Sequence, residues 1–201
     1  MTTETDIRIP VISQADLPDW PAEELASRTP AELIALLIEN EDRVPRSLID
    51  ACAARGDTMV DALRASGLFE GELTASGGRW WLRLHACMIL GLIPGDSAGR
   101  LLVDLMCAMA RTDDHNLQDW LSGYWPALFA NKPGTTVELL RKLALDRKHD
   151  WYIRSNAIEA VLGMEDRENG PGLDAALHWL ADIAADRDED LDMRLICGNM
   201  L

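Results

Sequence analysis

Apolar side chains recur at helical spacing along most of the chain. In the stretch 30–40, Leu33, Leu36 and Leu37 occupy the i, i+3 and i+4 positions that line one face of a helix. Similar stretches follow, separated by Gly, Pro and Asp, and no strand is expected. The pattern predicts helices over residues 30–40, 45–54, 57–67, 79–91, 96–110, 114–130, 135–145, 150–164 and 173–185, with a last one from about residue 190.

Local signals predict where several of these helices begin. Thr29 with Glu32 reads as a capping box, with Pro30 at the first helical position, and Thr135 with Glu138 reads as a second one. Pro126 falls inside the stretch 114–130, where its ring and its missing N–H predict a kink. Two further caps are expected from Asp57 and Asp150.

One segment recurs in weaker copies. Its clearest form is Arg83-x-x-Ala86-x-x-Ile89-Leu90-Gly91, and another copy runs from Arg154 to Gly163 with one extra residue. A period of about 40 residues with two helices per unit is typical of the HEAT/armadillo class, in which stacked pairs bury an apolar face that one pair cannot bury alone. The aligned positions, separated by 37, 35, 36 and 40 residues, are Arg46, Arg83, Gln118, Arg154 and Arg194.

The segment that begins at Arg83 resembles the inner-helix signature of HEAT-type α-solenoids, in which an Arg leads into Ala-x-x-apolar-Leu-Gly. The runs WWLRLHACMIL, WLSGYWPALFA and LRKLALDRKHDWYIRSNAIEAVL are similar to a family of bacterial HEAT-like proteins catalogued as a domain of unknown function. This resemblance implies an all-α, right-handed superhelix of about five helix pairs over residues 29–201, and it implies no activity. Some relatives carry a C-terminal zinc-binding tail, which is absent here.

The two ends of the chain differ from the repeats. Residues 1–28 contain three prolines and form an irregular leader with one short helix expected over 21–26. Apolar anchors such as Ile9 and Trp20 favour packing of this leader across the first repeat. Residues 198–201 lack the polar cap of a typical solenoid end, which indicates either truncation or packing against a neighbour.

Charge narrows the classes of partner. The formal net charge is −15, and 26% of the residues are charged. Affinity for nucleic acid comes largely from Lys and Arg, so nucleic acids and anionic membranes are disfavoured partners. No apolar run reaches the roughly 18–20 residues of a membrane span, and the acidic N-terminus does not resemble a secretion signal. A cytoplasmic location is expected.

Motifs for cofactor or metal chemistry are missing from the sequence. There is no Walker, dinucleotide or zinc motif, so no cofactor is expected. The four cysteines form no CxxC pair and are expected to be buried, reduced thiols: Cys52, Cys87, Cys107 and Cys197. His85 lies only two residues from Cys87, which places the two on different sides of a helix and disfavours a shared metal.

Two acidic clusters invite a metal interpretation that the spacing does not support. Asp113 and Asp114, next to His115, are explained by a helix cap, with a metal or catalytic site as the alternative. The alternating aspartates of residues 186–192 imitate a calcium loop, but Leu191 and Cys197 occupy the positions that require Gly and Glu. An acidic turn between helices is the better explanation.

Arginines and aromatic residues are the remaining candidates for recognition. Arg83, Arg154 and Arg194 are expected to pair with acidic residues of neighbouring units, with a ligand-facing role as the alternative. Trp120, Tyr124 and Trp125 lie within six residues of one another, and Trp151-Tyr152 follows in the next equivalent helix. Either these aromatics pack in the core or they form an exposed patch that marks a partner site.

These observations predict a non-enzymatic module that binds a basic peptide or protein segment. The predicted recognition face is formed by the second helices of the pairs, with Trp120, Tyr124, Trp151, Arg83 and Arg154. One alternative is a nucleic-acid-processing enzyme like the alkylated-base glycosylases built on similar repeats. Asp113, Asp114 and Trp120 would then act in a basic groove. Another alternative is a structural protein that forms homo-oligomers.

Overall fold

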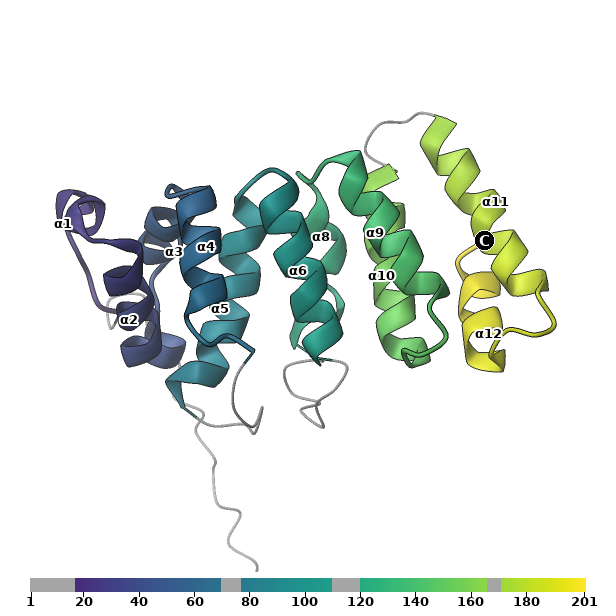
Figure 1. Ribbon diagram of the computed structural model, residues 1–201, viewed down its shortest axis with the longest axis horizontal. Coiled ribbons are helices and arrows are strands. Elements are labelled where there is room, and N and C mark those ends of the chain that lie inside the picture. Colours follow the sequence, from purple (N-terminus) through teal and green to yellow (C-terminus); the bar gives the residue numbers. More distant parts are fainter. Residues whose placement is uncertain (1–16, 70–76, 110–119, 166–170) are drawn as a thin grey trace, which may run out of the picture.

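The protein is described by a computed structural model that places residues 17–69, 77–109, 120–165 and 171–201. Among these residues the regular elements are all helices, joined by turns, and there is no strand, as the apolar pattern predicts (Figure 1). The elements are α1 (Ala22–Ser27), α2 (Pro30–Asn40), η2 (Glu41–Arg43), α3 (Arg46–Ala53), α4 (Asp57–Ala65), α5 (Gly78–Leu92), α6 (Asp96–Met109), α8 (Trp125–Phe129), α9 (Gly134–Leu145), α10 (Trp151–Glu165), α11 (Pro171–Ala185) and α12 (Leu191–Asn199).

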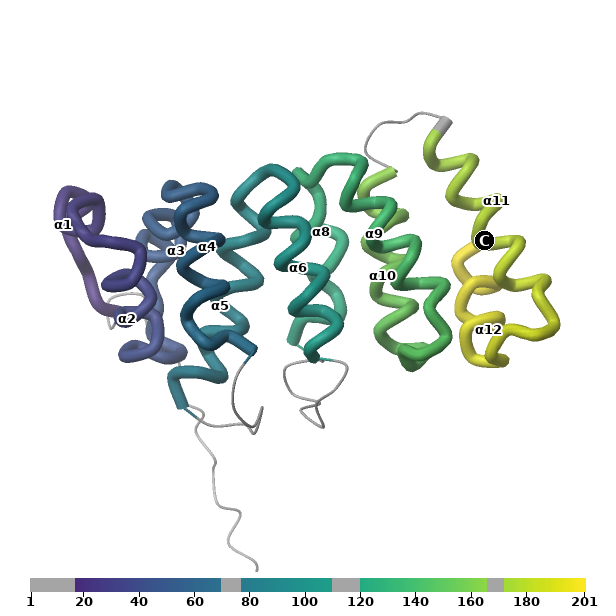
Figure 2. The backbone as a smooth tube through the Cα atoms, viewed as in Figure 1, coloured from purple at the N-terminus to yellow at the C-terminus, as the bar shows by residue number. Residues whose placement is uncertain are grey.

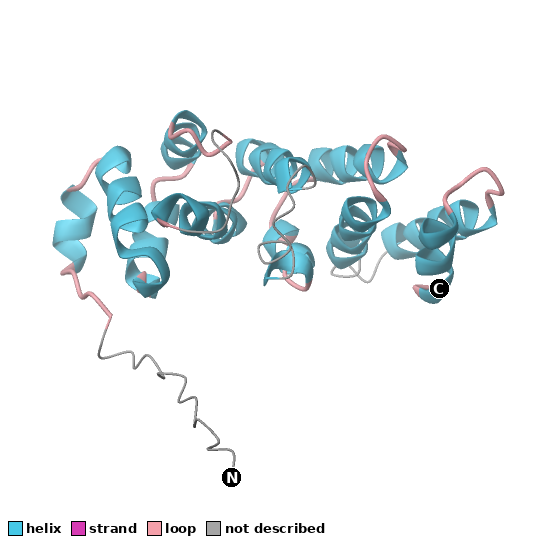
Figure 3. Cartoon of the chain, turned by 90° about the horizontal axis from the view of Figure 1, so that it is seen from below, coloured by secondary structure: helices cyan, strands magenta, loops and turns pink. Residues whose placement is uncertain are grey.

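The helices stand side by side in two layers. Helix α6 contacts α4 and α9 in one layer, while the other layer runs from α5 through α8 and α10 to α12. Figure 2 shows the chain passing up and down between the layers, and Figure 3 shows the layers from below. Leucines, isoleucines and methionines from both layers form one buried apolar cluster along the row. The helices therefore bury apolar side chains against their neighbours along the row.

Polar contacts between successive parts of the row join residues about 40 positions apart. Thr135 donates its hydroxyl to the carboxylate of Asp96 across 39 residues, and Arg64 binds Asp104 at 3.2 Å across 40. The side-chain amide of Asn131 donates to the carbonyl oxygen of residue 92, again 39 residues away. These three separations are close to the period read from the sequence, while other long-range contacts span 24 to 44 residues.

Most predicted helix starts lie within a residue or two of those observed. Thr29 accepts a hydrogen bond from the backbone N–H of Glu32, whose carboxylate accepts one from the N–H of Thr29 at 2.7 Å, so this capping box is confirmed. Asp150 accepts a bond from the N–H of Ile153 at 3.0 Å and caps α10 as expected. Asp57 instead occupies the first turn of α4 and makes no side-chain cap.

The second predicted capping box is wrong. Helix α9 begins at Gly134, one residue before Thr135, and no side chain caps it. The Thr135 hydroxyl bonds Asp96 at the start of α6 instead. The hydroxyl of Thr135 therefore bonds a carboxylate of the neighbouring helix rather than a backbone N–H of its own helix.

The kink predicted at Pro126 is also wrong. Residues 120–122 are helical, residues 123–124 form a turn, and α8 begins at Trp125. Pro126 therefore lies in the first turn of a new helix, where its missing N–H has no intrahelical partner to lose. The beginning of the predicted helix, residues 114–119, lies outside the described residues.

The short helix expected in the leader is present as α1, and it packs on α3. Trp20, just before α1, is half-buried against the core cluster. Ile9 lies outside the described residues.

The four cysteines form no disulfide. Cys52, Cys87 and Cys197 are buried, and Cys107 is half-buried. Burial raises the pKa of the Cys52 and Cys87 thiols to about 12 and that of Cys197 to about 11. These three thiols are therefore protonated, packed groups rather than reactive ones.

Glycine in the repeated segment permits close helix packing around α8. Gly91 of α5 and Gly163 of α10 are equivalent residues of the repeat, and they meet α8 from its two sides. A Cβ atom added at Gly91 would lie 2.7 Å from a methyl carbon of Leu128. One added at Gly163 would lie 2.5 Å from Cβ and 3.2 Å from Cα of Pro126. Both distances are shorter than side chains tolerate, so the signature glycines set the spacing of these helices.

The substitution Gly163→Ala is expected to lower the free energy of unfolding by about 1–2 kcal/mol, because overpacking outweighs the better helix propensity of alanine. Gly198→Ala in α12 is the control, since nothing lies within 4 Å of the added Cβ. That change is expected to raise stability by up to about 1 kcal/mol. Urea denaturation of both variants measures the difference, and equal effects would contradict the packing argument.

Candidate functional site

Three of the four aligned arginines, Arg83, Arg154 and Arg194, tie the two helices of a pair together, whereas Arg46 is exposed and pairs with Asp50 of its own helix. The Nε–H of Arg154 donates to the carbonyl oxygen of Ala144 at 2.7 Å, and that of Arg194 donates to Ala184 at 3.2 Å. Arg83 makes the same bond to the carbonyl of Leu68, just beyond α4, at 3.1 Å. Carbonyls at the end of a helix have no intrahelical donor, and a cation there also interacts favourably with the helix dipole.

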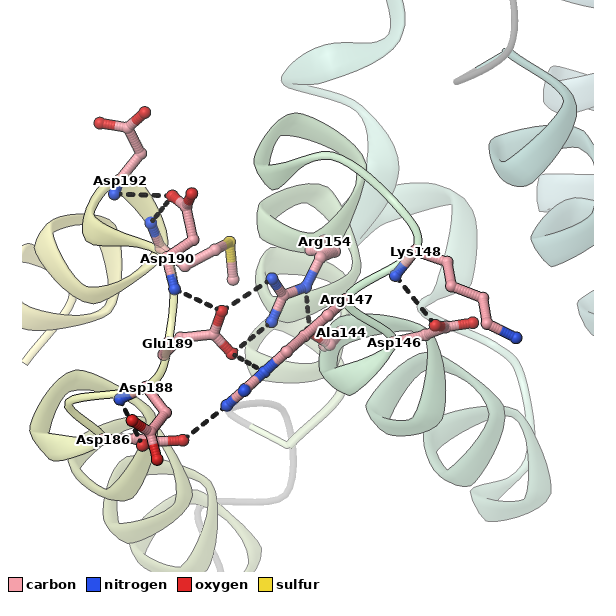
Figure 4. A network of polar contacts seen from close by, with 11 residues as sticks. Ala144, Asp146, Arg147, Lys148, Arg154, Asp186, Asp188, Glu189, Asp190 and Asp192 are labelled. Atoms are coloured by element: carbon pink, nitrogen blue, oxygen red, sulfur yellow. Dashed lines mark hydrogen bonds and ion pairs between the residues drawn. The ribbon is translucent and has the colours of Figure 1, made fainter.

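Arg154 also forms a buried ion pair with the next unit. Its two Nη atoms lie 2.9 and 2.6 Å from the carboxylate oxygens of Glu189, in the turn between α11 and α12 (Figure 4). Glu189 further accepts the N–H of Asp190 at 2.7 Å and lies 3.4 Å from Nε of Arg147. The bond from Arg154 is the main reason that the pKa of Glu189 falls from 4.5 to about 2. The predicted pairing with an acidic residue of the neighbouring unit is thus observed for Arg154.

Burial removes two residues from the predicted recognition face. The side chains of Arg83 and Arg154 are buried, and their guanidinium groups are directed to carbonyls and carboxylate inside the protein. Side chains that are only 4% and 2% exposed leave almost no surface for a ligand to contact. Neither arginine can therefore belong to an exposed recognition surface.

Loss of the buried carboxylate is expected to be costly. Glu189→Gln should lower the free energy of unfolding by about 3 kcal/mol at pH 7, because it leaves Arg154 as a buried, unpaired charge. Because its pKa is lower in the folded state, this glutamate stabilises the fold fully above about pH 4.5, and the stabilisation is lost as the pH falls toward 2. The difference in the free energy of unfolding between wild type and variant should therefore become smaller as the pH falls from about 4.5 toward 2.

A matched control is Asp186→Asn, which breaks an ion pair at 2.7 Å between Arg147 and Asp186 on the surface beside the buried one. Exposed pairs contribute about 0–1 kcal/mol, so this variant should remain close to wild type. Denaturant titrations of both variants at several pH values provide the test. If Glu189→Gln lowers the free energy of unfolding no more than Asp186→Asn does, the buried ion pair does not contribute to stability beyond an exposed one.

Three of the predicted aromatic residues are exposed. The exposed fractions are 52% for Trp120, 57% for Tyr124 and 44% for Trp151, which are high values for such large side chains. Trp120 and Tyr124 precede α8, while Trp151 opens α10, and these two helices contact one another. Trp125 is buried, as the core interpretation expects, and Tyr152 is half-buried beside Trp151.

One member of this aromatic group was not identified from the sequence. The ring of Trp81, at the start of α5, meets that of Trp120 edge-to-face with centroids 5.9 Å apart. Trp81 also meets Trp80 at 4.8 Å and stacks on His85 at 6.1 Å. The doubled tryptophan before Arg83 was the available signal, but which of the two faces outward depends on packing. Trp80 is buried although it matches the exposed Trp151 in the repeat.

His85 has a structural role. Its Nε2 lies 2.6 Å from the carbonyl oxygen of Glu41, which makes Nε2 the protonated nitrogen of a neutral ring. Burial lowers the pKa of this histidine, consistent with the neutral form. Together with the buried Cys87, it behaves as a packed core residue, and its bond ties α5 to the turn after α2.

An open pocket lies next to Trp151, between the turn before α10 and the turn before α12. Its volume is about 630 Å³. Asp150 and Asp190 in its wall cap α10 and α12, and Glu189 is held by Arg154. The full lining is Arg147, Lys148, His149, Asp150, Trp151, Arg154, Asp188, Glu189 and Asp190. The mixture of charges favours neither a free anion nor a free cation.

The acidic turn of residues 186–192 uses its carboxylates locally. Asp186 accepts bonds from Arg147 and from the N–H of Asp188, and Asp190 accepts the N–H groups of Asp192 and Met193. Within the described ranges, no three His, Cys, Asp or Glu side chains are arranged to hold a metal ion. Asp113 and Asp114, the candidates for a catalytic acid, lie outside these ranges.

None of the helices that the structure describes combines the length and apolar character needed to cross a bilayer. The sequence matches no protein-family model, and searches of curated proteins and of solved structures gave no match either. The resemblance to HEAT-like proteins therefore stays a prediction. Any function proposed for the chain rests on its own residues.

Proposed function

We propose that the protein is a HEAT-like α-solenoid, a right-handed superhelix of about five helix pairs. The pairs would be α2/α3, α4/α5, α6 with the segment ending in α8, α9/α10 and α11/α12. Support comes from the two-layered row of helices and from polar contacts that span 39 or 40 residues. The arginine bonds within the α9/α10 and α11/α12 pairs, both to a carbonyl ten residues earlier, give further support.

We propose further that the chain is a protein-binding module without enzymatic activity. The observation that carries this proposal is the exposure of Trp120, Tyr124 and Trp151 on neighbouring second helices. Burying a tryptophan or tyrosine against a partner removes much apolar area from water at a small cost in side-chain entropy, which makes these residues frequent interface anchors. Half-buried Trp81 extends the same surface through its contact with Trp120.

The partner we propose is a basic peptide or protein segment. The chain has 34 acidic and 19 basic residues, and among the described residues three cations (Arg83, Lys132 and Arg154) are buried against one carboxylate (Glu189). The surface that remains is therefore more acidic than the composition indicates. Such a field speeds the encounter with a cationic partner and repels nucleic acid. No observation among the described residues favours the glycosylase alternative, which needs a basic groove.

The proposal is tested by affinity capture from native lysate, read by mass spectrometry. Wild type is compared with the double variant Trp120→Ala/Trp151→Ala, which removes two anchors and leaves the buried arginines in place. A specific partner is expected with wild type and is expected to be depleted at least about tenfold with the variant, as for a loss of hot-spot residues.

Leu92→Ala serves as the control, because Leu92 is also an exposed apolar residue but lies at the opposite end of α5 from Trp81. Circular dichroism and the melting temperature establish that each variant is folded. Equal recovery of all proteins with the double variant and with wild type would remove the aromatic surface from consideration.

A further inference from the structure

Helix α12 is apolar on two opposite faces. Met193 and Cys197, one turn apart, are buried and face the rest of the protein. Leu191 and Leu195 are also one turn apart, but they lie on the other side of the helix and are 63% and 57% exposed. Gly198 continues this outer stripe at the same spacing, with nothing within 4 Å of a Cβ built on it. We call Leu191, Leu195 and Gly198 the outer face of α12.

Comparison with α10 shows what such a helix normally requires. Helix α10 also carries buried residues around most of its circumference, and α8, α9, α11 and α12 all pack against it. Among the described helices, α12 packs mainly on α10 and α11, at one end of the row (Figure 1). An apolar helix face is ordinarily covered by a neighbour, and the face turned to solvent is ordinarily polar. The outer face of α12 therefore has the composition of an interface and no cover within the described chain.

The charges around this face select the chemistry of its occupant. Asp188, Asp190 and Asp192 are exposed at the start of α12, and so is one basic residue of the same turn, Arg187, which leaves the turn acidic overall. Arg194, the basic residue of this helix, is turned away to the carbonyl of Ala184. An apolar stripe with an acidic rim is complementary to an amphipathic helix that carries leucines on one face and lysines or arginines beside them.

A second copy of the chain fits this face less well. Two copies would bring the same acidic rims and net charges of −15 together. A helix of nine residues is about 13 Å long and offers a face on the order of 150 Å². A stable dimer buries roughly 800 Å² on each partner. A short cationic helix does not need that area in order to bind reversibly.

We propose that the outer face of α12 is a docking site for a short amphipathic helix with basic flanks. Leu191 and Leu195 would contact the apolar stripe of the partner, and Asp188 and Asp192 would attract its basic residues. This site is separate from the aromatic surface before α8 and α10.

The test uses the full chain and a fluorescein-labelled model peptide with leucines at helical spacing and lysines at the other positions. Saturable binding by fluorescence anisotropy is expected, with an affinity that falls as salt is added. Leu195→Gln should weaken binding by about tenfold or more, because it removes a buried leucine from the contact. Leu92→Gln, an exposed leucine elsewhere, should leave the affinity unchanged.

Two further comparisons separate charge from apolar contact. A peptide with glutamate in place of every lysine should not bind, and Asp188→Asn/Asp192→Asn should weaken binding of the lysine peptide. The variant Trp120→Ala/Trp151→Ala should bind the lysine peptide with the wild-type affinity, because it leaves α12 unchanged. A result against the aromatic surface can therefore be told apart from a result against the outer face of α12. If the Leu195→Gln variant does not fold, Leu191→Gln is used in its place.

Three results would overturn the proposal. The first is no binding of the lysine peptide by wild type, and the second is equal binding by Leu195→Gln. The third comes from sedimentation velocity: a wild-type dimer that Leu195→Gln dissociates would assign the face to a second copy of the chain.

Discussion

The stack depends on cationic side chains that supply donors to the ends of helices. Arg154 and Arg194 do this within their pairs, and Arg55 donates to three carbonyls at the end of α1. Lys132 reaches back to the carbonyls of Gly91 and Ile93 at the end of α5, and burial lowers its pKa to about 8. The last carbonyls of a helix lack donors of their own, so burying them in a stack requires such partners.

This use of cations also shapes the surface. Arg83, Arg154 and Lys132 are buried, while the aspartates around the helix starts remain outside as caps and as exposed charges. A protein with a net charge of −15 that places part of its positive charge inside presents an even more acidic exterior. The same interactions that hold the helices together therefore favour cationic partners, without any residue dedicated to that purpose.

Besides single exposed apolar side chains such as Leu92 and Leu145, this exterior carries two groups of them. Trp120 and Tyr124 precede α8 and Trp151 opens α10, while Leu191 and Leu195 lie along α12. Aromatic rings suit a varied contact surface, whereas a leucine stripe suits another helix. A row of similar helices thus offers distinct surfaces, because each helix presents whatever its neighbours leave uncovered.

Local sequence determined the all-helical fold, most helix boundaries and the period of about 40 residues, because caps and apolar stripes act within one or two turns. Tertiary structure decided the rest. Thr135 bonds Asp96 instead of closing its own capping box, Glu189 is the partner of Arg154, and Trp80 is buried while Trp151 is exposed. Each outcome depends on which group lies across the contact, often 35–40 residues away in the chain, and on whether a neighbour covers the helix there. Spacing along one helix carries neither piece of information.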